Sequence, residues 1–391
     1  MRASTLIWLI AGCLMLQPLS TDLYLSSLPH LATYFAATPA AVQQTLSMFV
    51  IGFGAAQLVA GPLSDRYGRR PVLMGGLATY LAASLACGLA PTLPLLVFSR
   101  FLQAAGACTG VVVARAIVRD VYTPAQGARA LAKAQSLLTL VPIFGPVLGS
   151  YLQVALGWRA AFGAQAAFCA LLAWAIWSKL EETNAQKNPE ATRVRGLLAA
   201  YALVLKTPAF WAYTLPASLS YSALFAFLAG ASFVLIRVLG VATENYGYCH
   251  AFAVVGYLSG TLICRHLLGR IGIKRTFAVG MNLSLFSAVF FVGLALAGVS
   301  HWLLVVLAMF LTMCSQGINF ACAQAGAIAP FPKQAGTAAG MVGAITMLAA
   351  WPAGAIVGAS FDGTLLPLAL VSGGASTLAF VTAVMLRRYR S

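Results

Sequence analysis

The chain contains very little charge, and acidic side chains are especially scarce. Only 8% of its 391 residues are charged and eight are Asp or Glu, whereas 61% are hydrophobic. A water-soluble domain of this size needs far more polar surface. Several uncharged stretches reach or exceed the roughly 20 residues that span a bilayer. They are residues 23–64, 71–99, 134–158, 207–236, 276–332 and 334–361. The sequence therefore predicts a helical protein that crosses a membrane many times.

The sequence motifs of common enzymes and of ATP-driven pumps are also missing. There is no H-E-x-x-H or G-x-S-x-G, and no Lys follows a Gly, which excludes a P-loop lysine. The eight cysteines fall in or at the ends of apolar stretches and form no C-x-x-C pair. We interpret them as packing residues. We therefore expect no enzyme, no cofactor and no metal site.

The formal charge of +16 is concentrated in alternate loops. Breaks in charge and turn residues divide the chain into twelve expected spans. They are residues 5–28, 41–63, 71–90, 94–118, 131–154, 160–179, 208–236, 246–267, 275–297, 301–329, 335–359 and 364–386. One set of loops carries most of the Lys and Arg, and the other holds little more than Arg159 and Arg237. By the positive-inside rule the basic loops and both termini are cytoplasmic. We interpret the charge as a topology signal that contacts anionic lipid, and not as a nucleic-acid site.

A long polar break lies near the middle of the chain, at residues 179–195. Six expected spans precede it and six follow. We expect residues 1–180 and 207–391 to form two six-helix bundles, joined by a cytoplasmic linker at residues 181–206. A weak internal repeat supports this division, because a shift of 204 residues aligns two basic loops. The aligned residues are Leu63 with Leu267, Arg66 with Arg270, Gly68 with Gly272 and Arg70 with Lys274. The second copy lacks an acid at the position of Asp65.

Residues 61–70, GPLSDRYGRR, concentrate charge between two apolar runs. At every specified position they resemble the signature G-x-L-x-D-R-x-G-R-[KR] of the major facilitator superfamily. RFLQAAG at residues 100–106 is similar to the fourth-helix motif R-x-x-Q-G-x-G, with Ala104 in place of the first glycine. VPIFGPVLGSYL at residues 141–152 is similar to the fifth-helix antiporter motif G-P-x-x-G-G, with Ser150 in place of the last glycine.

Two further stretches narrow the resemblance. STDLYLSSLP in the first expected span and ARAIVRDVY at the end of the fourth resemble the bicyclomycin- and chloramphenicol-resistance branch of the twelve-helix drug:proton antiporters. This implies the major facilitator fold, all-α with twelve transmembrane helices in two six-helix halves, in the bacterial cytoplasmic (inner) membrane.

The predicted function is a proton-coupled antiporter that exports small amphipathic compounds, such as phenicol- or bicyclomycin-like antibiotics, by alternating access. Export of an endogenous metabolite is a close alternative, and a proton-coupled uptake symporter a more distant one. The expected energy source is the proton gradient, with no cofactor. The expected partners are a small-molecule substrate, protons and membrane lipid, and we expect a monomer.

The resemblance also implies a role for Asp65. In the family this acid lies near the start of the eleventh helix, here residues 334–340, and a helix N-terminus stabilises an exposed carboxylate by ~0.3–1 kcal/mol. We expect this contact to latch the two halves on the cytoplasmic side when the site opens outward. The alternative is a basic loop that only sets topology and holds one solvated Asp.

Gly145 and Gly149 in the fifth expected span are four residues apart, so they share a helix face and allow another helix to approach closely. From the resemblance, we interpret this face as the surface on which the two halves rock against each other. Ordinary packing of small residues is the alternative. The complete set of expected gate residues is Gly61, Asp65, Arg66, Gly68, Arg69, Arg70, Arg119, Asp120, Gly145, Pro146 and Gly149.

Asp22 is the only acid well inside an expected span, and Arg100 is the one basic residue at a comparable depth. The first span is expected to end near Pro29 and the fourth to begin near Pro94, so both charges would lie ~9–10 Å below the outer edge. We expect them to form a pair. A charge within a membrane marks a pathway or relay by default, so Asp22 is predicted to carry the proton. The alternatives are a static structural pair and a proton site at His250.

The substrate cavity is expected to be apolar and aromatic with few polar anchors, which suits amphipathic drug-sized molecules. The expected substrate contacts are Gln17, Tyr24, Gln103, Tyr221, Phe225, Tyr257 and Asn319. Because Arg100 is expected to offset the charge of Asp22, neutral or zwitterionic substrates are predicted. A cation would be costly in an apolar cavity without a free counter-charge.

Overall fold

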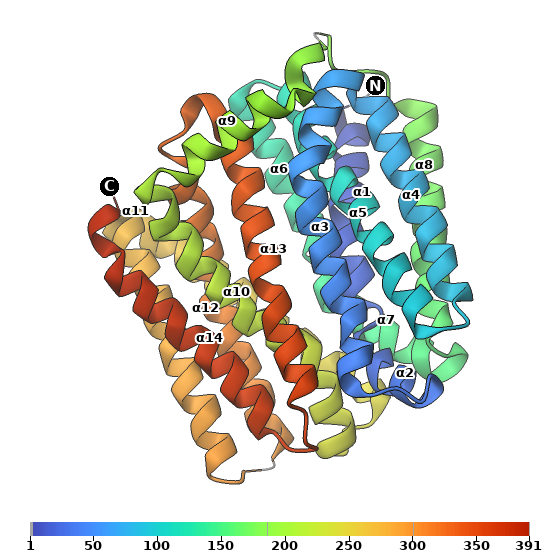
Figure 1. Ribbon diagram of the computed structural model, residues 1–391, viewed down its shortest axis with the longest axis vertical. Helices are drawn as coiled ribbons and strands as arrows, with labels where there is room; N and C mark the ends of the chain where they lie inside the picture. Colours follow the sequence, from blue (N-terminus) through green and yellow to red (C-terminus); the bar gives the residue numbers. More distant parts are fainter. Residues whose placement is uncertain (1–2, 186, 300, 391) are drawn as a thin grey trace. The chain divides into compact units, whose positions relative to one another are not determined.

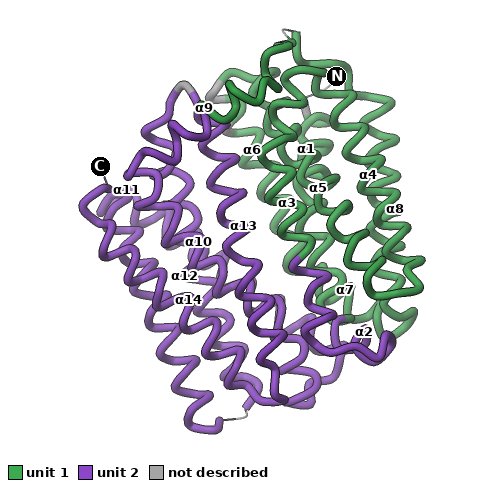
Figure 2. Tube along the Cα trace, viewed as in Figure 1, with its two compact units in different colours: residues 1–27, 48–199 green, residues 28–47, 200–391 purple. Residues whose placement is uncertain are grey.

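A computed structural model describes residues 3–185, 187–299 and 301–390 of the chain. All regular secondary structure in these residues is helical (Figure 1). Met1, Arg2, Gln186, Ser300 and Ser391 lie outside the described residues. The described chain divides into two compact units, which are coloured separately in Figure 2.

Unit 1 comprises residues 1–27 and 48–199. Its helices are connected by short turns, as is usual for neighbouring antiparallel helices. They are α1 (Ala3–Asp22), η1 (Leu25–Ser27), most of α3 (Pro39–Tyr67), α4 (Arg69–Leu89), α5 (Leu93–Val121), α6 (Pro124–Leu138), α7 (Leu140–Leu156), α8 (Arg159–Lys179), η2 (Pro189–Thr192) and the first half of α9 (Val194–Leu205), whose second half belongs to unit 2.

Unit 2 comprises residues 28–47 and 200–391. Its helices are α2 (Leu28–Tyr34), the start of α3, α10 (Pro208–Ser232), the π-helix η3 (Phe233–Val238), α11 (Thr243–Leu296), α12 (Trp302–Ile328), η4 (Pro332–Gln334), α13 (Ala335–Ala359), α14 (Leu366–Met385) and η5 (Arg387–Tyr389). Residues 28–47 were expected in the first half, but hydrogen bonds join them to unit 2. The Gln43 Nε2 donates to the Ala229 carbonyl at 2.9 Å, and His30 bonds Thr243 at 3.1 Å.

Eleven segments of the described chain are long and apolar enough to cross a membrane. One of them, α11, is 54 residues long, and Gly272 interrupts it with φ 73° and ψ 171°. A side chain is strained at such a positive φ, so glycine permits the chain to break there. Residues 243–271 and 273–296 are therefore two helices, and the total agrees with the twelve predicted spans.

Helices pack closely within each unit where glycine removes a side chain. In unit 1 a Cβ on Gly106 of α5 would lie 2.6 Å from the Gly76 carbonyl oxygen of α4. In unit 2 a Cβ on Gly260 of α11 would lie 2.9 Å from the Cys314 carbonyl carbon of α12. Within a membrane, such close contact supplies the van der Waals attraction that holds helices together.

The first helix is shorter than the sequence predicted. It ends at Asp22 instead of continuing to about residue 28. The Tyr24 N–H donates to the Thr21 carbonyl at 3.2 Å, so the chain turns tightly there. Pro29 contributes to the break, because it has no N–H that could continue the helix hydrogen bonds from α1, and it lies instead in the first turn of α2. Asp22 is therefore the last residue of α1 and does not lie well inside a continuous helix.

Candidate functional site

Asp22 is buried at the end of α1 and has no cationic partner among the described residues. Its side chain and backbone are together only 6% exposed. The Thr21 hydroxyl donates to Asp22 Oδ1 at 2.9 Å, and no ion pair with Asp22 occurs in the described part of the chain. The C-terminal end of a helix carries partial negative charge, which does not favour a carboxylate. Asp22 is therefore an isolated acid in a membrane-spanning segment.

Arg100 of α5 is fully buried, but polar groups and aromatic rings of unit 1 surround it. Its Nη1 donates to the Ser20 carbonyl at 3.0 Å and to Gln103 Oε1 at 2.5 Å. The guanidinium carbon also lies 4.3 Å from the Phe49 ring centroid and 4.8 Å from that of Tyr24. Carbonyl, amide and ring faces stabilise the cation here.

The expected pair of Asp22 and Arg100 is therefore wrong. Arg100 directs its hydrogen bonds to groups other than the carboxylate, and the two residues make no ion pair. Sequence depth placed both charges at the same level, but it contained no information about which acceptors lie nearest to the guanidinium.

Gln103 continues this network toward α4 and α8. Its Nε2 donates to Ser84 Oγ and to Gln165 Oε1, both at 2.8 Å. Ser20 also shares a 2.7 Å hydrogen bond with Tyr80. The network ties α1, α4, α5 and α8 together in the interior of unit 1.

Gly145 and Gly149 of α7 lie against the break at the end of α1. A Cβ on Gly145 would lie 3.2 Å from the Asp22 Cβ. A Cβ on Gly149 would lie 2.7 Å from the Leu23 carbonyl carbon and 2.8 Å from its Cα. This face packs against the end of α1 in its own unit, as the alternative of ordinary small-residue packing expects, and its role between the two halves stays a prediction. The chain turns across α7 at Leu23, and only glycine leaves room for that backbone.

The expected gate residues near the end of α3 form a charge cluster. Arg69 is 3% exposed; its Nη1 lies 2.6 Å from Asp65 Oδ1 and its Nε 2.7 Å from Asp120 Oδ2. Arg119 lies at the edge, 3.9 Å from Asp65. The cluster therefore joins the end of α3, the start of α4 and the end of α5 through one buried cation.

The other arginines of the loop bind backbone and linker groups. Arg66 donates to the Thr192 hydroxyl, and Arg70 donates to the Trp177 carbonyl at 2.9 Å. Gly68 immediately precedes α4 and has φ 106°, while a Cβ on Gly61 would lie 3.9 Å from Val112 Cγ1. Pro146 is buried in α7.

Unit 2 contains a second buried polar network, centred on Asn319 of α12. Its Nδ2 donates to Ser220 Oγ of α10 at 3.0 Å and to Ser284 Oγ of α11 at 3.2 Å. The Ser220 hydroxyl donates to Gln316 Oε1 at 2.8 Å. Sequence reasoning missed Ser220, Ser284 and the pairing with Gln316. A signal was available, because Gln316-x-x-Asn319 repeats the spacing of Arg100-x-x-Gln103.

The expected substrate contacts differ in their accessibility. Four are buried within their own units, namely Tyr24, Gln103, Phe225 and Asn319. Three are half-buried, namely Gln17, Tyr221 and Tyr257.

Residues 10–355 match the family description Major Facilitator Superfamily. The chain belongs to this superfamily. A bicyclomycin resistance protein homolog from Haemophilus influenzae is 25% identical over 374 residues, which cover 95% of this chain and 94% of the relative. A chloramphenicol resistance protein from Pseudomonas aeruginosa is 31% identical over 333 residues, which cover 83% of this chain and 76% of the relative.

Solved structures show the same fold. The nucleoside transporter NupG matches with a TM-score of 0.75 and 14% identity, over 97% of this chain and 99% of that one. The xylose transporter XylE from E. coli matches with a TM-score of 0.70 and 14% identity, over 97% of this chain and 96% of that one. The predicted family, its drug-efflux branch and the prediction of a transporter instead of an enzyme are confirmed.

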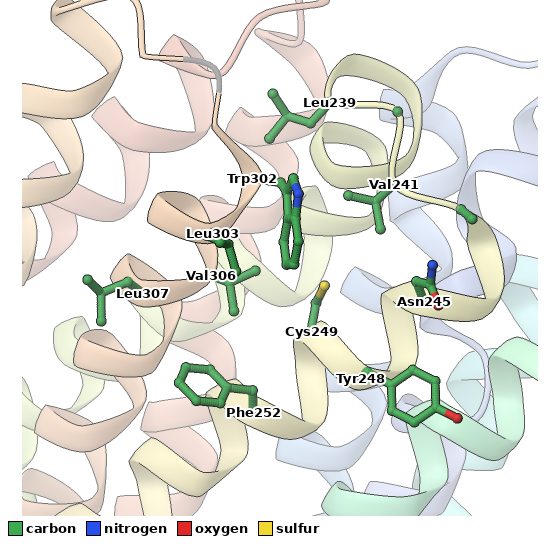
Figure 3. Close-up of a pocket in the computed structure, with 12 residues that line it drawn as sticks. Leu239, Val241, Asn245, Tyr248, Cys249, Phe252, Trp302, Leu303, Val306 and Leu307 are labelled. Atoms are coloured by element: carbon green, nitrogen blue, oxygen red, sulfur yellow. The ribbon is translucent and has the colours of Figure 1, made fainter.

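This major facilitator protein also has a cavity of about 770 Å³ within unit 2, where α11 and α12 begin. Figure 3 shows Trp302, Cys249 and Phe252 around it, with Tyr248 at one side. Its volume is in the range of drug-sized ligand sites. None of the expected substrate contacts lines it.

The contact between α7 and α1 leads to the first testable prediction. Gly149→Ala is expected to lower the melting temperature, because the new methyl group would overlap the Leu23 backbone. Overpacking of this kind typically destabilises a protein by about 1–3 kcal/mol. Thermal unfolding of the purified protein in detergent measures the effect.

Gly163→Ala in α8 is the matched control, since nothing lies within 4 Å of a Cβ built there. It should leave the melting temperature unchanged or raise it slightly, because Ala favours a helix over Gly. Equal melting temperatures for the two variants would contradict the close packing of Gly149.

Proposed function

We propose that this protein is a proton-coupled antiporter of the bacterial inner membrane that exports small amphipathic compounds by alternating access. Its relatives include proteins named for bicyclomycin and chloramphenicol resistance. The isolated carboxylate of Asp22 is the single observation that carries the coupling mechanism.

An antiporter needs a group that holds a proton in one half of its cycle and releases it in the other. Asp22 has a hydrogen bond from Thr21 and no basic partner in the described structure. A charged carboxylate in such a place is costly, and protonation removes that cost. We infer that release of the proton requires water or a substrate group to reach Asp22.

The packing of α7 supports this proposal. Gly145 places the backbone of α7 against Asp22, and Gly149 does the same at Leu23. A small movement of α7 along the α1 break would change the space beside the carboxylate. Access to the acid would then depend on conformation, which coupling requires.

The substrates we propose are phenicol-like antibiotics and other amphipathic molecules. The earlier reason to exclude cations was that Arg100 offsets Asp22, and this reason no longer holds. Arg100 is engaged with Ser20, Gln103 and aromatic rings. We therefore propose that a cationic substrate can also bind, and that it pairs directly with the Asp22 carboxylate after Asp22 has released its proton.

The charge cluster at the end of α3 is proposed as the gate. Arg69 has two carboxylate partners, Asp65 and Asp120, and is almost fully buried. Removal of one partner leaves a buried cation incompletely paired, which is strongly unfavourable. The state in which the cluster is assembled would then be less populated.

Asp22→Asn should abolish uphill transport, because the amide cannot carry the proton. Substrate binding at equilibrium should remain for neutral compounds. Proton flux into liposomes that contain the purified variant, with and without substrate, measures the loss.

The matched control is Asp362→Asn, which removes an exposed acid that bonds only within its own loop. It should transport like the wild type. Proton-coupled export by Asp22→Asn at wild-type rate would exclude Asp22 as the carrier and direct attention to His250.

Asp120→Asn should slow turnover about tenfold with less than a twofold change in KM, because about 1.4 kcal/mol in a rate-limiting conformational step corresponds to a tenfold change. Asp65→Asn should act in the same direction. Glu190→Gln, which removes an exposed partner of Arg193, is the control. Unchanged turnover in both cluster variants would contradict a gating role.

Expression in a pump-deficient bacterium tests the substrate class. We expect protection against phenicols and against ethidium, and both should be lost in Asp22→Asn because uphill export of either compound needs the proton carrier. Protection against neither phenicols nor bicyclomycin, together with export of a cellular metabolite, would favour the alternative function.

A further inference from the structure

The linker after α8 places one carboxylate at the start of α4. Glu182 Oε1 accepts the backbone N–H of Arg69 at 2.8 Å, and Oε2 accepts that of Arg70 at 3.1 Å. Oε1 also accepts the N–H groups of Thr183 at 3.0 Å and Asn184 at 2.9 Å. The first N–H groups of a helix have no partner within the helix, so Glu182 caps α4 from a segment more than a hundred residues away in the chain.

This cap depends on Gly68. A Cβ at Gly68 would lie 2.5 Å from Glu182 Oε2, where the carboxylate now sits. The repeat in unit 2 has the same glycine turn at Gly272, with φ 73°, but nothing lies within 4 Å of a Cβ there. The glycine turn is therefore common to both halves, whereas the docked carboxylate occurs at the first one.

The linker also holds the other side of the turn. The Asn184 Nδ2 donates to the Asp65 carbonyl at 3.1 Å, and the Asn188 N–H donates to the same oxygen at 3.0 Å. Asp65 is also the residue whose carboxylate pairs with Arg69. The linker thus fixes both backbone positions, residues 65 and 69, that carry the buried ion pair.

We propose that Glu182 is a positioning residue for the gate: it docks the linker on the start of α4 and so holds Arg69 between Asp65 and Asp120. This inference rests on the proposed alternating-access function. The chain passes from α8 through this linker to α10, so an undocked linker would release the gate and a docked linker would hold it assembled.

The environment of Glu182 agrees with this role. Burial raises the pKa of its carboxyl group, but the N–H groups of Asn184, Arg69, Arg70 and Thr183 donate to the carboxylate and together lower the pKa by more than burial raises it. The net pKa is therefore below its ordinary value. A carboxylate with a lowered pKa stabilises the docked state above that pKa. Docking should therefore persist at neutral pH and be lost as the pH falls through the lowered pKa.

Glu182→Ala tests the proposal, with Glu181→Ala as the control. Glu181 is an exposed neighbour of the same charge, and it makes no hydrogen bond in the described structure. The first measurement is the rate of tryptic cleavage at Lys187 in the purified protein. Glu182→Ala should accelerate cleavage at least fivefold at neutral pH, and Glu181→Ala should leave it unchanged.

The second measurement reports on the gate without transport. Spin labels at residues 67 and 121 occupy the exposed ends of α3 and α5. Their distance distribution should broaden in Glu182→Ala and stay unchanged in Glu181→Ala. An unchanged distribution in Glu182→Ala would overturn the positioning role, even if the linker is cleaved faster.

Transport provides the third measurement. Turnover should fall about tenfold in Glu182→Ala with KM changed less than twofold, and Glu182→Gln should lie between this variant and the wild type. Normal turnover in Glu182→Ala would overturn the proposal. If the wild type itself does not transport, the proposed function fails, whereas cleavage and spin-label distances still decide whether Glu182 positions the cluster.

A glycine pair keeps the test valid if Glu182→Ala folds poorly. Gly68→Ala adds a methyl group in the place of the carboxylate, and Gly272→Ala adds only the backbone strain of a side chain at positive φ. Faster cleavage and a broader distance distribution are expected for Gly68→Ala alone. Equal behaviour of the two variants would overturn the proposal.

Discussion

A charge inside a membrane-spanning segment is costly unless polar groups surround it, and the interior of unit 1 is organised by this constraint. Arg100 meets it in part, because its Nη1 donates to the Ser20 carbonyl and the Gln103 amide oxygen and two aromatic rings face the guanidinium, while its Nε and Nη2 make no hydrogen bond within the described residues. Asp22 has less support, because among the described residues only the Thr21 hydroxyl donates to its carboxylate. The difference separates a structural cation from an acid whose charged state needs help from water or substrate. Proton coupling, as proposed, depends on that difference.

In both units a network of buried hydrogen bonds joins the helices, but the network of unit 1 contains a charged residue, Arg100. In unit 1 the network from Arg100 and Gln103 joins α5 to α1, α4 and α8. In unit 2 Asn319 joins α12 to α10 and α11 through serine hydroxyls. Gln316 takes the first place of the Gln316-x-x-Asn319 spacing that Arg100 takes in Arg100-x-x-Gln103, and the groups joined in the second network are uncharged. Both units therefore have a polar interior that joins their helices, and Asp22, the acid proposed for coupling, lies in unit 1.

The second concentration of charge lies at the end of α3, and backbone geometry controls it as much as ion pairing does. Arg69 is held by two carboxylates, but its own N–H is held by Glu182. The positive φ of Gly68 turns the chain so that both contacts are possible. Gly68 thus turns the chain and also leaves room for the Glu182 carboxylate that caps the start of α4.

The sequence alone determined the class of the protein, its twelve spans and its family, because hydropathy over 20 residues and motifs of ten residues are local properties. It also identified Asp22, Arg100 and the charged loop as exceptional. Tertiary structure decided which groups meet. The early end of α1, the separation of Arg100 from Asp22 and the contact of Gly149 with Leu23 depend on helices far apart in the chain. Glu182 is the clearest case: nothing in its own segment predicts a partner at Arg69, because the first N–H groups of a helix can donate to any acceptor that the fold brings within reach.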